Sequence, residues 1–577
     1  MPISSGSPLA AAGSSFEIGG GRALLTALSA FLETFSPRPE LLALGEPTHG
    51  EPAFPSLRNR IFEALVEHGF RSIAIESDGV SALDVDAFVH DQRGTFDVAV
   101  AQGFSHGFGQ LEANRELVAW MRTYNDQLPT SERLAFYGFD APLEMIDAPS
   151  PRSYLEHALD YLAEQLGPGS LLHSHDELER LLGDDERWSD PAVRTDPEKS
   201  VGASTEAARL RVIADDLTTA LHAQAPRLVA ASSSAEWHRA ELLARTACGL
   251  LRYHAQAAAT APQALRTSRL LGVRDALMAE NLLAIRAREQ HRGATLVFAH
   301  NRHLQRHLST LRMADMDLEW FSAGAILASL VGERYVFIAG SLGASATLEL
   351  SAPSAGTFEG ALQQAMRGCA LFHATPLNAA LGADAGKLHV RTDVTAELGY
   401  FPLDAATLGH SNGVLHVASS SKAPAPDADD LAARIVAMRE VSCVRADEAS
   451  GAPEVAWGDR FFYAGPDRRL PFATIVESDY PGWDEASRLD RPGVFRLNID
   501  LGRAMFEQAF GFSPAAFGER QASIDFTKFD EFLPHPAYAA QGWACILNPS
   551  ARRLLAVDVL LDGARRRVLA RQRRSSK

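Results

Sequence analysis

The sequence predicts an α/β protein: a largely parallel sheet with helices on both faces and a long helical insertion, followed by a smaller α+β domain. Three observations support this prediction. Short apolar runs alternate with helical periodicity over about the first 340 residues. A stretch at about 151–290 has helical spacing and almost no strand signal. A linker-like segment then precedes a second alternation of helices and strands.

Five apolar runs are the candidate strands of the sheet. Each is about the length of a strand and is apolar on both faces, as strands buried between two layers of helices must be. Helices are expected to connect them, which makes the strands parallel. The runs are LLALGE (41–46), RSIAIES (71–77), LAFYGFD (134–140), TLVFAH (295–300) and YVFIAG (335–340).

The chain is expected to divide into two domains. A Gly/Ser-rich flexible leader spans 1–21, and the first domain spans 22–416 with its helical insertion. A Ser/Ala/Pro/Asp-rich linker at 417–430 precedes an α+β domain at 431–577. The arginines at the end of the chain are expected to form a frayed, solvated helix end.

Composition excludes several functional classes. The 577 residues carry a formal net charge of −17, which opposes nucleic-acid binding. The four cysteines show no disulfide or zinc spacing, so a reducing compartment is expected. The N-terminus lacks the features of a signal peptide, and no run of about 18 uncharged apolar residues follows. We therefore expect a cytoplasmic protein that binds neither nucleic acid nor membrane, with no cofactor and no metal.

Acids and histidines stand at the ends of four predicted strands. In open α/β sheets, ligands bind beyond the carboxyl ends of the strands. Carboxylates and imidazoles in one cleft shift each other's pKa values and can provide a base near neutral pH, which favours a hydrolase. The candidates are Glu46 and His49 after the first run, Glu76 after the second, Asp140 after the third, and His300, Asn301 and His303 after the fourth.

These residues lie in motifs that resemble the erythromycin esterase family. The opening LLALGEPTHGEPAF with GFRSIAIES downstream is similar to the start of that family, and further motifs follow in the family's order over about 20–415. The tryptophan-rich stretch often seen in the family is here QGFSHGFGQLEANREL (102–117). The other matching motifs are WMRTYN, AFYGFDAPL, RDALMAENL, FAHNRHL and AGAILASLVGERYVFIAG.

The resemblance implies roles for five residues and a class of substrate. His49 is expected to be the general base, supported by the carboxylates of Glu46 and Glu76. His300 and Arg274 are expected to bind the carbonyl oxygen or the leaving oxygen. The implied substrate is a small-molecule ester or a macrolactone, such as the macrolide erythromycin.

Three further residues, Asp140, Asn301 and His303, are candidates for substrate binding.

Three of the candidate site residues also have a structural interpretation. His49 can cap the helix after the first strand, Arg274 can pair with a neighbouring acid, and Asp140 can hold a loop through backbone amides.

Three other functions compete with base-catalysed hydrolysis. GFSHG (103–107) satisfies G-x-S-x-G, so Ser105 could be the nucleophile of a serine esterase, with Asp140 and His300 completing its triad. His300, His303 and His307 have a spacing that could bind zinc. A non-catalytic binding or regulatory protein is also consistent, because the C-terminal region resembles DUF6194, a bacterial family of unknown function.

Overall fold

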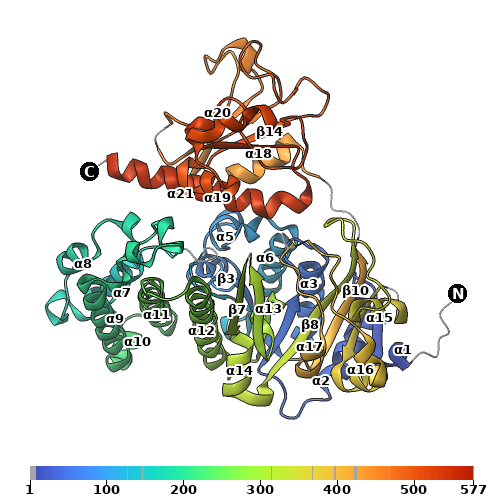
Figure 1. Cartoon of the computed structure of the whole chain (residues 1–577). Helices are drawn as coiled ribbons and strands as arrows, with labels where there is room; N and C mark the ends of the chain where they lie inside the picture. The colour runs from blue at the N-terminus through green and yellow to red at the C-terminus, as the bar shows by residue number, and fades with distance from the viewer. Residues whose placement is uncertain are drawn as a thin grey trace.

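The computed structural model describes residues 8–575, except 127, 144–147, 314, 367, 396–397, 421–424, 439 and 467. It contains an eight-stranded sheet in the order β1-β9-β10-β8-β2-β5-β3-β4 and a six-stranded sheet in the order β11-β12-β13-β14-β16-β15. Helices flank the larger sheet, and the smaller sheet lies in a separate C-terminal unit (Figure 1). The predicted fold class, α/β followed by a smaller α+β unit, is confirmed.

The larger sheet is formed by β1 (Gly13–Phe16), β2 (Leu41–Glu46), β3 (Phe70–Asp78), β4 (Ala135–Asp140), β5 (Ala294–His300), β8 (Tyr335–Ser345), β9 (Cys369–His373) and β10 (Gly413–Ser420). The smaller sheet is formed by β11 (Val441–Arg445), β12 (Arg460–Ala464), β13 (Ala473–Val476), β14 (Arg496–Asp500), β15 (Leu533–Pro534) and β16 (Trp543–Leu547). A hairpin pairs β6 (Leu308–Met313) with β7 (Met316–Phe321).

The helices up to the insertion are α1 (Pro8–Ala12), α2 (Gly21–Leu32), α3 (Ala53–Glu67), α4 (Ala82–Val89), α5 (Phe96–Gln102) and α6 (Glu112–Asn125). The insertion contains α7 (Arg152–Leu166), α8 (His175–Leu182), α9 (Thr205–Ala223), α10 (Ala225–Ala231), α11 (Ser234–Ala257) and α12 (Gln263–Glu289). The remaining helices are α13 (Asn301–Leu304), α14 (Ala323–Val331), α15 (Phe358–Ala365), α16 (Ala374–Leu381), α17 (Ala405–His410), α18 (Ala428–Val436), α19 (Gly502–Phe510), α20 (Phe517–Arg520) and α21 (Leu554–Ser575).

The five predicted strands all belong to the parallel part of the larger sheet. Adjacent strands from β10 to β4 pair in parallel, so their carboxyl ends lie at one edge. In the register of β2 and β5, Glu46 lies opposite His300. The strand ends that carry the candidate residues therefore meet, as the sequence predicts.

Side chains that alternate along the strands enter two cores on opposite faces of this sheet. Leu42 and Leu44 of β2 pack with α2, α3 and α6, whereas Leu41 and Ala43 pack with α12, α14 and α15. All four are essentially inaccessible to solvent. Strands covered on both faces must be apolar throughout, which is why these runs are recognisable in the sequence.

The segment after residue 340, where the sequence signal weakens, completes the sheet. β9 pairs antiparallel with both β10 and β1, and these strands extend the sheet beyond β10. Because β1 spans Gly13–Phe16, the predicted flexible leader at 1–21 is wrong for these residues; residues 1–7 lie outside the described part. The predicted linker at 417–430 is also too long, because β10 extends to Ser420 and α18 begins at Ala428.

The helical insertion forms a lobe beside the sheet with a core of its own. Leucines and alanines of α7, α8, α9 and α11 form this core, and the lobe extends to one side in Figure 1. The last helix of the insertion, α12, returns to the sheet and packs through Met278 and Leu282. This return places the middle of α12 close to the ends of the strands.

The C-terminal unit has a separate core between its antiparallel sheet and α18, α19 and α21. The basic end was expected to be a frayed, solvated helix end, but residues 564–568 lie in the packed part of α21. Val557, Leu561, Ala564 and Val568 of α21 are buried in this core, and Arg567 pairs with Asp500. The apolar spacing of these four residues, rather than the arginines, determines how this helix packs.

No helix within the described ranges is both long enough and apolar enough to cross a bilayer.

A fragment spanning 425–577 is expected to be soluble and to melt cooperatively, because its core draws only on residues of this unit. Circular dichroism during heating tests this. A shorter fragment that starts at residue 437 serves as a control: it lacks the buried Leu431 and Ile435 of α18 and should lose the transition. A gradual, non-cooperative melt of the longer fragment would contradict a separate domain.

Candidate functional site

His49 and Glu46 form the first part of a polar cluster at the carboxyl edge of the sheet. Glu46 is the last residue of β2, and its Oε1 lies 2.7 Å from Nδ1 of His49. A carboxylate accepts a hydrogen bond, so Nδ1 carries a proton, and in the neutral ring Nε2 carries the lone pair. The His49 side chain is 35% exposed, whereas that of Glu46 is 9% exposed. The free nitrogen of His49 is therefore accessible to a small molecule.

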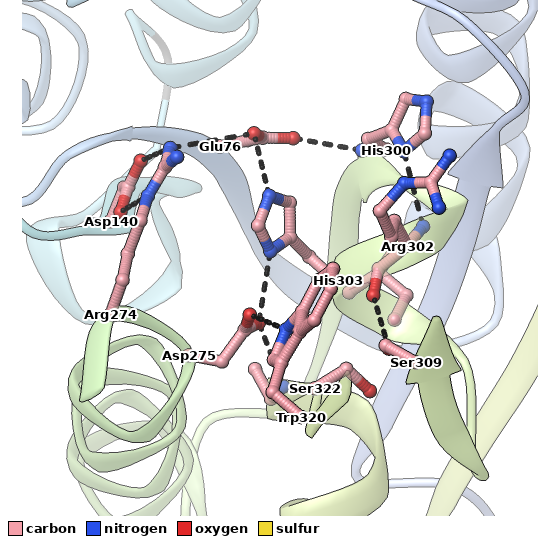
Figure 2. Close-up of polar contacts among 12 residues, drawn as sticks. Glu76, Asp140, Arg274, Asp275, His300, Arg302, His303, Ser309, Trp320 and Ser322 are labelled. Atoms are coloured by element: carbon pink, nitrogen blue, oxygen red, sulfur yellow. Dashed lines mark hydrogen bonds and ion pairs between the residues drawn. The ribbon is translucent and has the colours of Figure 1, made fainter. Parts of the chain in front are cut away.

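Glu76 is the centre of the cluster, as Figure 2 shows. It lies on β3 where the register with β4 shifts between Ile75 and Asp78, and such an irregularity redirects a side chain. Its Oε2 accepts a hydrogen bond of 2.8 Å from the backbone N–H of His300. Its Oε1 lies 3.4 Å from Nε2 of His303, 3.8 Å from Nη2 of Arg274 and 3.8 Å from Nε2 of His49.

These neighbours keep Glu76 ionised although it is buried. Burial alone would raise its pKa, but the charges of His303, His49 and Arg274 outweigh burial and lower the pKa to about 2. The same pairing acts on the histidine. Burial alone would lower the pKa of His49, but the charge of Glu76 and the hydrogen bond and charge of Glu46 raise it above its usual value.

Asp140 and Arg274 form a buried ion pair beside Glu76. Nε of Arg274 donates to Oδ1 of Asp140 over 3.1 Å, and Nη2 donates to Oδ2. Asp140 also accepts from the backbone N–H of Ala141 and lies 3.3 Å from Nε2 of His106. Burial would raise the pKa of Asp140, but Arg274 and His106 hold it well below its usual range. The two hydrogen bonds to Asp140 thus orient the guanidinium of Arg274.

His303 forms a second carboxylate–histidine pair. Its Nδ1 lies 2.9 Å from Oδ1 of Asp275, and Asp275 also accepts hydrogen bonds from Nε1 of Trp320 and from the backbone N–H of Ala323 (Figure 2). Burial would lower the pKa of His303, but Asp275 and Glu76 raise it. His303 therefore presents Nε2 to Glu76, as His49 does from the other side.

Two predicted site residues have structural contacts instead. The His300 ring lies 5.1 Å from the His49 ring, yet its Nδ1 accepts from the backbone N–H of Arg302 and its Nε2 donates to the carbonyl of Gly399. Both nitrogens are therefore occupied, and burial lowers its pKa well below the usual value. These contacts argue against the expected binding of a substrate oxygen by the His300 side chain, which stays a prediction.

Asn301 likewise does not face the open edge. Its buried amide donates to the carbonyl of Gly340 and accepts from the N–H of Gly340, which joins α13 to β8. The absence of a side chain at Gly45 makes room for it, because a Cβ there would lie 2.0 Å from Oδ1 of Asn301. The substrate contact expected of Asn301 stays a prediction, and in this structure its side chain packs between α13 and β8.

Two groups that were not predicted from the sequence support the site. Arg58 of α3 is fully buried and donates to the side-chain oxygens of Asn59 and Asn114. Burial raises the pKa of Glu46 above its usual value, and the charge of Arg58 partly opposes this rise. The signal for Arg58 was an arginine and an asparagine on the apolar face of a predicted helix. His106 and Phe108, whose ring lies 5.4 Å from that of His49, come from the stretch interpreted as a serine motif.

Ser105 does not have the surroundings of a serine nucleophile. The preceding VAVA belongs to α5 rather than to a strand, so the strand–turn–helix geometry of a nucleophile elbow is absent at this position. The Ser105 hydroxyl accepts from the backbone N–H of Asp78 and lies 3.3 Å from the hydroxyl of Ser77. It therefore ties the loop to β3.

The three histidines considered for zinc do not converge. The His307 ring stacks on that of His410, with centroids 5.2 Å apart, while His300 and His303 have the partners described above. Within the described ranges, no group of three or more His, Cys, Asp or Glu side chains has the geometry to hold a metal ion.

Two family models match the chain in succession. The model described as erythromycin esterase matches residues 65–417, and that described as a family of unknown function (DUF6194) matches residues 426–577. The chain belongs to the erythromycin esterase family. The matched segment contains Glu76, Asp140, Arg274 and His303, whereas Glu46 and His49 lie upstream of it.

Solved structures with a similar fold cover the N-terminal part. A protein from Bacillus cereus is 18% identical with a TM-score of 0.52, and the alignment covers 71% of this chain and 96% of that one. A succinoglycan biosynthesis protein is 15% identical with a TM-score of 0.52, covering 71% and 95%. A point mutant of erythromycin esterase EreC in its open conformation is 17% identical with a TM-score of 0.48, covering 70% and 95%. No curated protein matches the chain.

In this member of the erythromycin esterase family, Ser105 is expected to stay unmodified by a fluorophosphonate, because no histidine contacts its hydroxyl among the described residues. Intact-mass measurement after incubation tests this, with a serine hydrolase as positive control. An adduct on the peptide that contains Ser105 would support the serine esterase alternative.

Proposed function

We propose that this member of the erythromycin esterase family hydrolyses an ester or macrolactone, with His49 as the general base that activates water. The observation that carries the proposal is the contact of His49 with two carboxylates: Glu46 holds Nδ1, and Glu76 lies 3.8 Å from Nε2. This arrangement leaves one nitrogen available as a base and places negative charge where the protonated ring develops positive charge. His49 also lies at the carboxyl edge of the sheet, where its side chain is partly exposed.

The hydrolysis needs one proton to be moved and one oxyanion to be stabilised. Nε2 of His49 takes a proton from water as the water oxygen attacks the carbonyl carbon, and Glu46 and Glu76 stabilise the imidazolium that forms. Collapse of the intermediate breaks the bond to the alkoxy oxygen, which receives the proton from Nε2 of His49, and this restores the neutral base. The products are a carboxylic acid and an alcohol, or a ring-opened hydroxy acid from a lactone.

Arg274 and His303 supply the positively charged hydrogen-bond donors of the site. Two nitrogens of Arg274 engage Asp140, and the third, Nη1, takes no part in that pair and is a donor for the carbonyl oxygen. His303 presents Nε2 beside Glu76, and its raised pKa favours the protonated form. His303 thus donates to a substrate oxygen, the role that was expected of His300.

The substrate class follows from the family. A macrolide lactone such as erythromycin is the first candidate, and a smaller ester is the second. Phe108, 5.4 Å from His49, provides an apolar surface beside the base for the hydrocarbon part of either substrate.

His49→Ala is expected to lower the rate of hydrolysis by about 10² to 10⁴, the usual contribution of a positioned base. The measurement is mass spectrometry of erythromycin incubated with the purified protein, in which hydrolysis adds one water. His175→Ala is the matched control, because His175 is a half-exposed histidine on the insertion and pairs with Asp160. Near-normal turnover by a folded His49→Ala protein would remove His49 from the mechanism.

Glu76→Gln is expected to move the acidic limb of the pH–rate profile to lower pH. The base must be neutral, so activity falls as the pH drops through the pKa of His49, which Glu76 raises. Loss of that negative charge lowers the pKa of His49, so the neutral base persists at lower pH, although the maximal rate also falls. Glu63→Gln, in a surface pair with Arg60, is the control. An acidic limb that stays in place or moves upward would contradict the assignment.

A further inference from the structure

The loop between α5 and α6 contacts the candidate site on one side. Nε2 of His106 lies 3.3 Å from Oδ2 of Asp140, the carboxylate that orients Arg274. The ring of Phe108 lies 5.4 Å from that of His49 and 5.6 Å from that of His106. One short loop therefore contacts both the base and the arginine pair.

The other side of the same loop contacts the C-terminal unit. Nη1 of Arg434, on α18, donates to the carbonyl of Gln110 over 3.3 Å. Gly107 has a φ of 72° and lies against Asp558 of α21, so that a Cβ there would lie 2.6 Å from Cβ of Asp558. Asp562, one turn further along α21, lies within electrostatic reach of His106. Figure 1 shows α21 passing over α5 and α6.

The contact on the C-terminal side is held in a defined geometry. Asp558 is 4% exposed, and a buried carboxylate requires a charged partner. Arg434 provides it: Nε donates to Oδ1 over 2.7 Å and Nη2 donates to Oδ2. Because this paired fork fixes the plane of the guanidinium, the direction in which Nη1 reaches the Gln110 carbonyl is fixed as well.

We propose that the C-terminal domain is part of the catalytic apparatus, because its Arg434–Asp558 pair clamps the loop from His106 to Gln110 against the site. His106 is then a positioning residue: it acts on the substrate through Asp140 and Arg274. Phe108, held by the same clamp, covers one side of His49. This inference rests on the proposed hydrolysis for its effect on rate, whereas the clamp itself is a structural claim.

Two variants of the full chain weaken the clamp, each with a matched control. Arg434→Lys keeps a cation beside Asp558 but cannot form the fork and also reach Gln110; its control is Arg503→Lys, in an exposed pair with Glu507. Gly107→Ala adds a Cβ against Asp558; its control is Gly94→Ala, which has a similar φ of 80° with nothing within 4 Å of the added Cβ. Both alanine variants carry the same kind of backbone strain, so their difference reports the contact with the C-terminal domain.

Hydrogen exchange and kinetics are measured on each protein. Arg434→Lys and Gly107→Ala should raise amide exchange several-fold in peptides covering 105–110 and lower kcat on erythromycin by about tenfold to a hundredfold, with a smaller change in KM. The controls should match the wild type in both. Unchanged exchange in both clamp variants would overturn the clamp, and faster exchange with unchanged kcat would overturn its role in positioning. A wild-type protein that leaves erythromycin intact would contradict erythromycin as the substrate instead, and the exchange data alone would then decide the clamp.

Discussion

The carboxylate of Glu76 is the group on which the rest of the site depends. A buried, ionised carboxylate costs several kcal/mol unless charges and hydrogen bonds compensate it. Here the compensation comes from the N–H of His300, from His49 and His303, and from Arg274. These groups come from different strands and from the end of the insertion, so satisfying Glu76 brings distant parts of the chain together.

The two histidines beside Glu76 are arranged in the same way. His49 is held at Nδ1 by Glu46, and His303 is held at Nδ1 by Asp275, so that each ring presents Nε2 to the shared carboxylate. Each histidine has a raised pKa because it faces two acids. They differ in access: His49 is a third exposed, whereas His303 is 12% exposed. We infer from this difference that His49 meets water and His303 donates to a substrate oxygen.

The C-terminal unit extends this network through polar contacts. Its own core is complete without the N-terminal part, which explains how a separate family can supply it. Its link to the site passes through Arg434, Asp558 and the loop that carries His106. Such a polar contact between domains can be tuned by small changes without loss of either fold.

The sequence by itself determined the parallel strands except β10, the helical insertion and the residues at the strand ends. The reason is physical: a strand buried on both faces must be apolar, so the polar residue that ends it, such as Glu46 or Glu76, stands out. Parallel pairing then brings those ends to one edge without further information. The antiparallel strands β1 and β9 were not predicted, because they are only four and five residues long.

Only the tertiary structure decided what each polar residue contacts. Sequence spacing treats His300 and His303 alike, yet local backbone groups occupy both nitrogens of His300, whereas Asp275, from the distant α12, holds His303. GFSHG matches a serine-hydrolase motif in sequence, but it follows a helix instead of a strand. His106 of this motif, rather than Ser105, contacts the site through Asp140. Contacts between residues far apart in the chain depend on how helices pack on the sheet. Local sequence patterns do not specify that packing, so they do not predict these contacts.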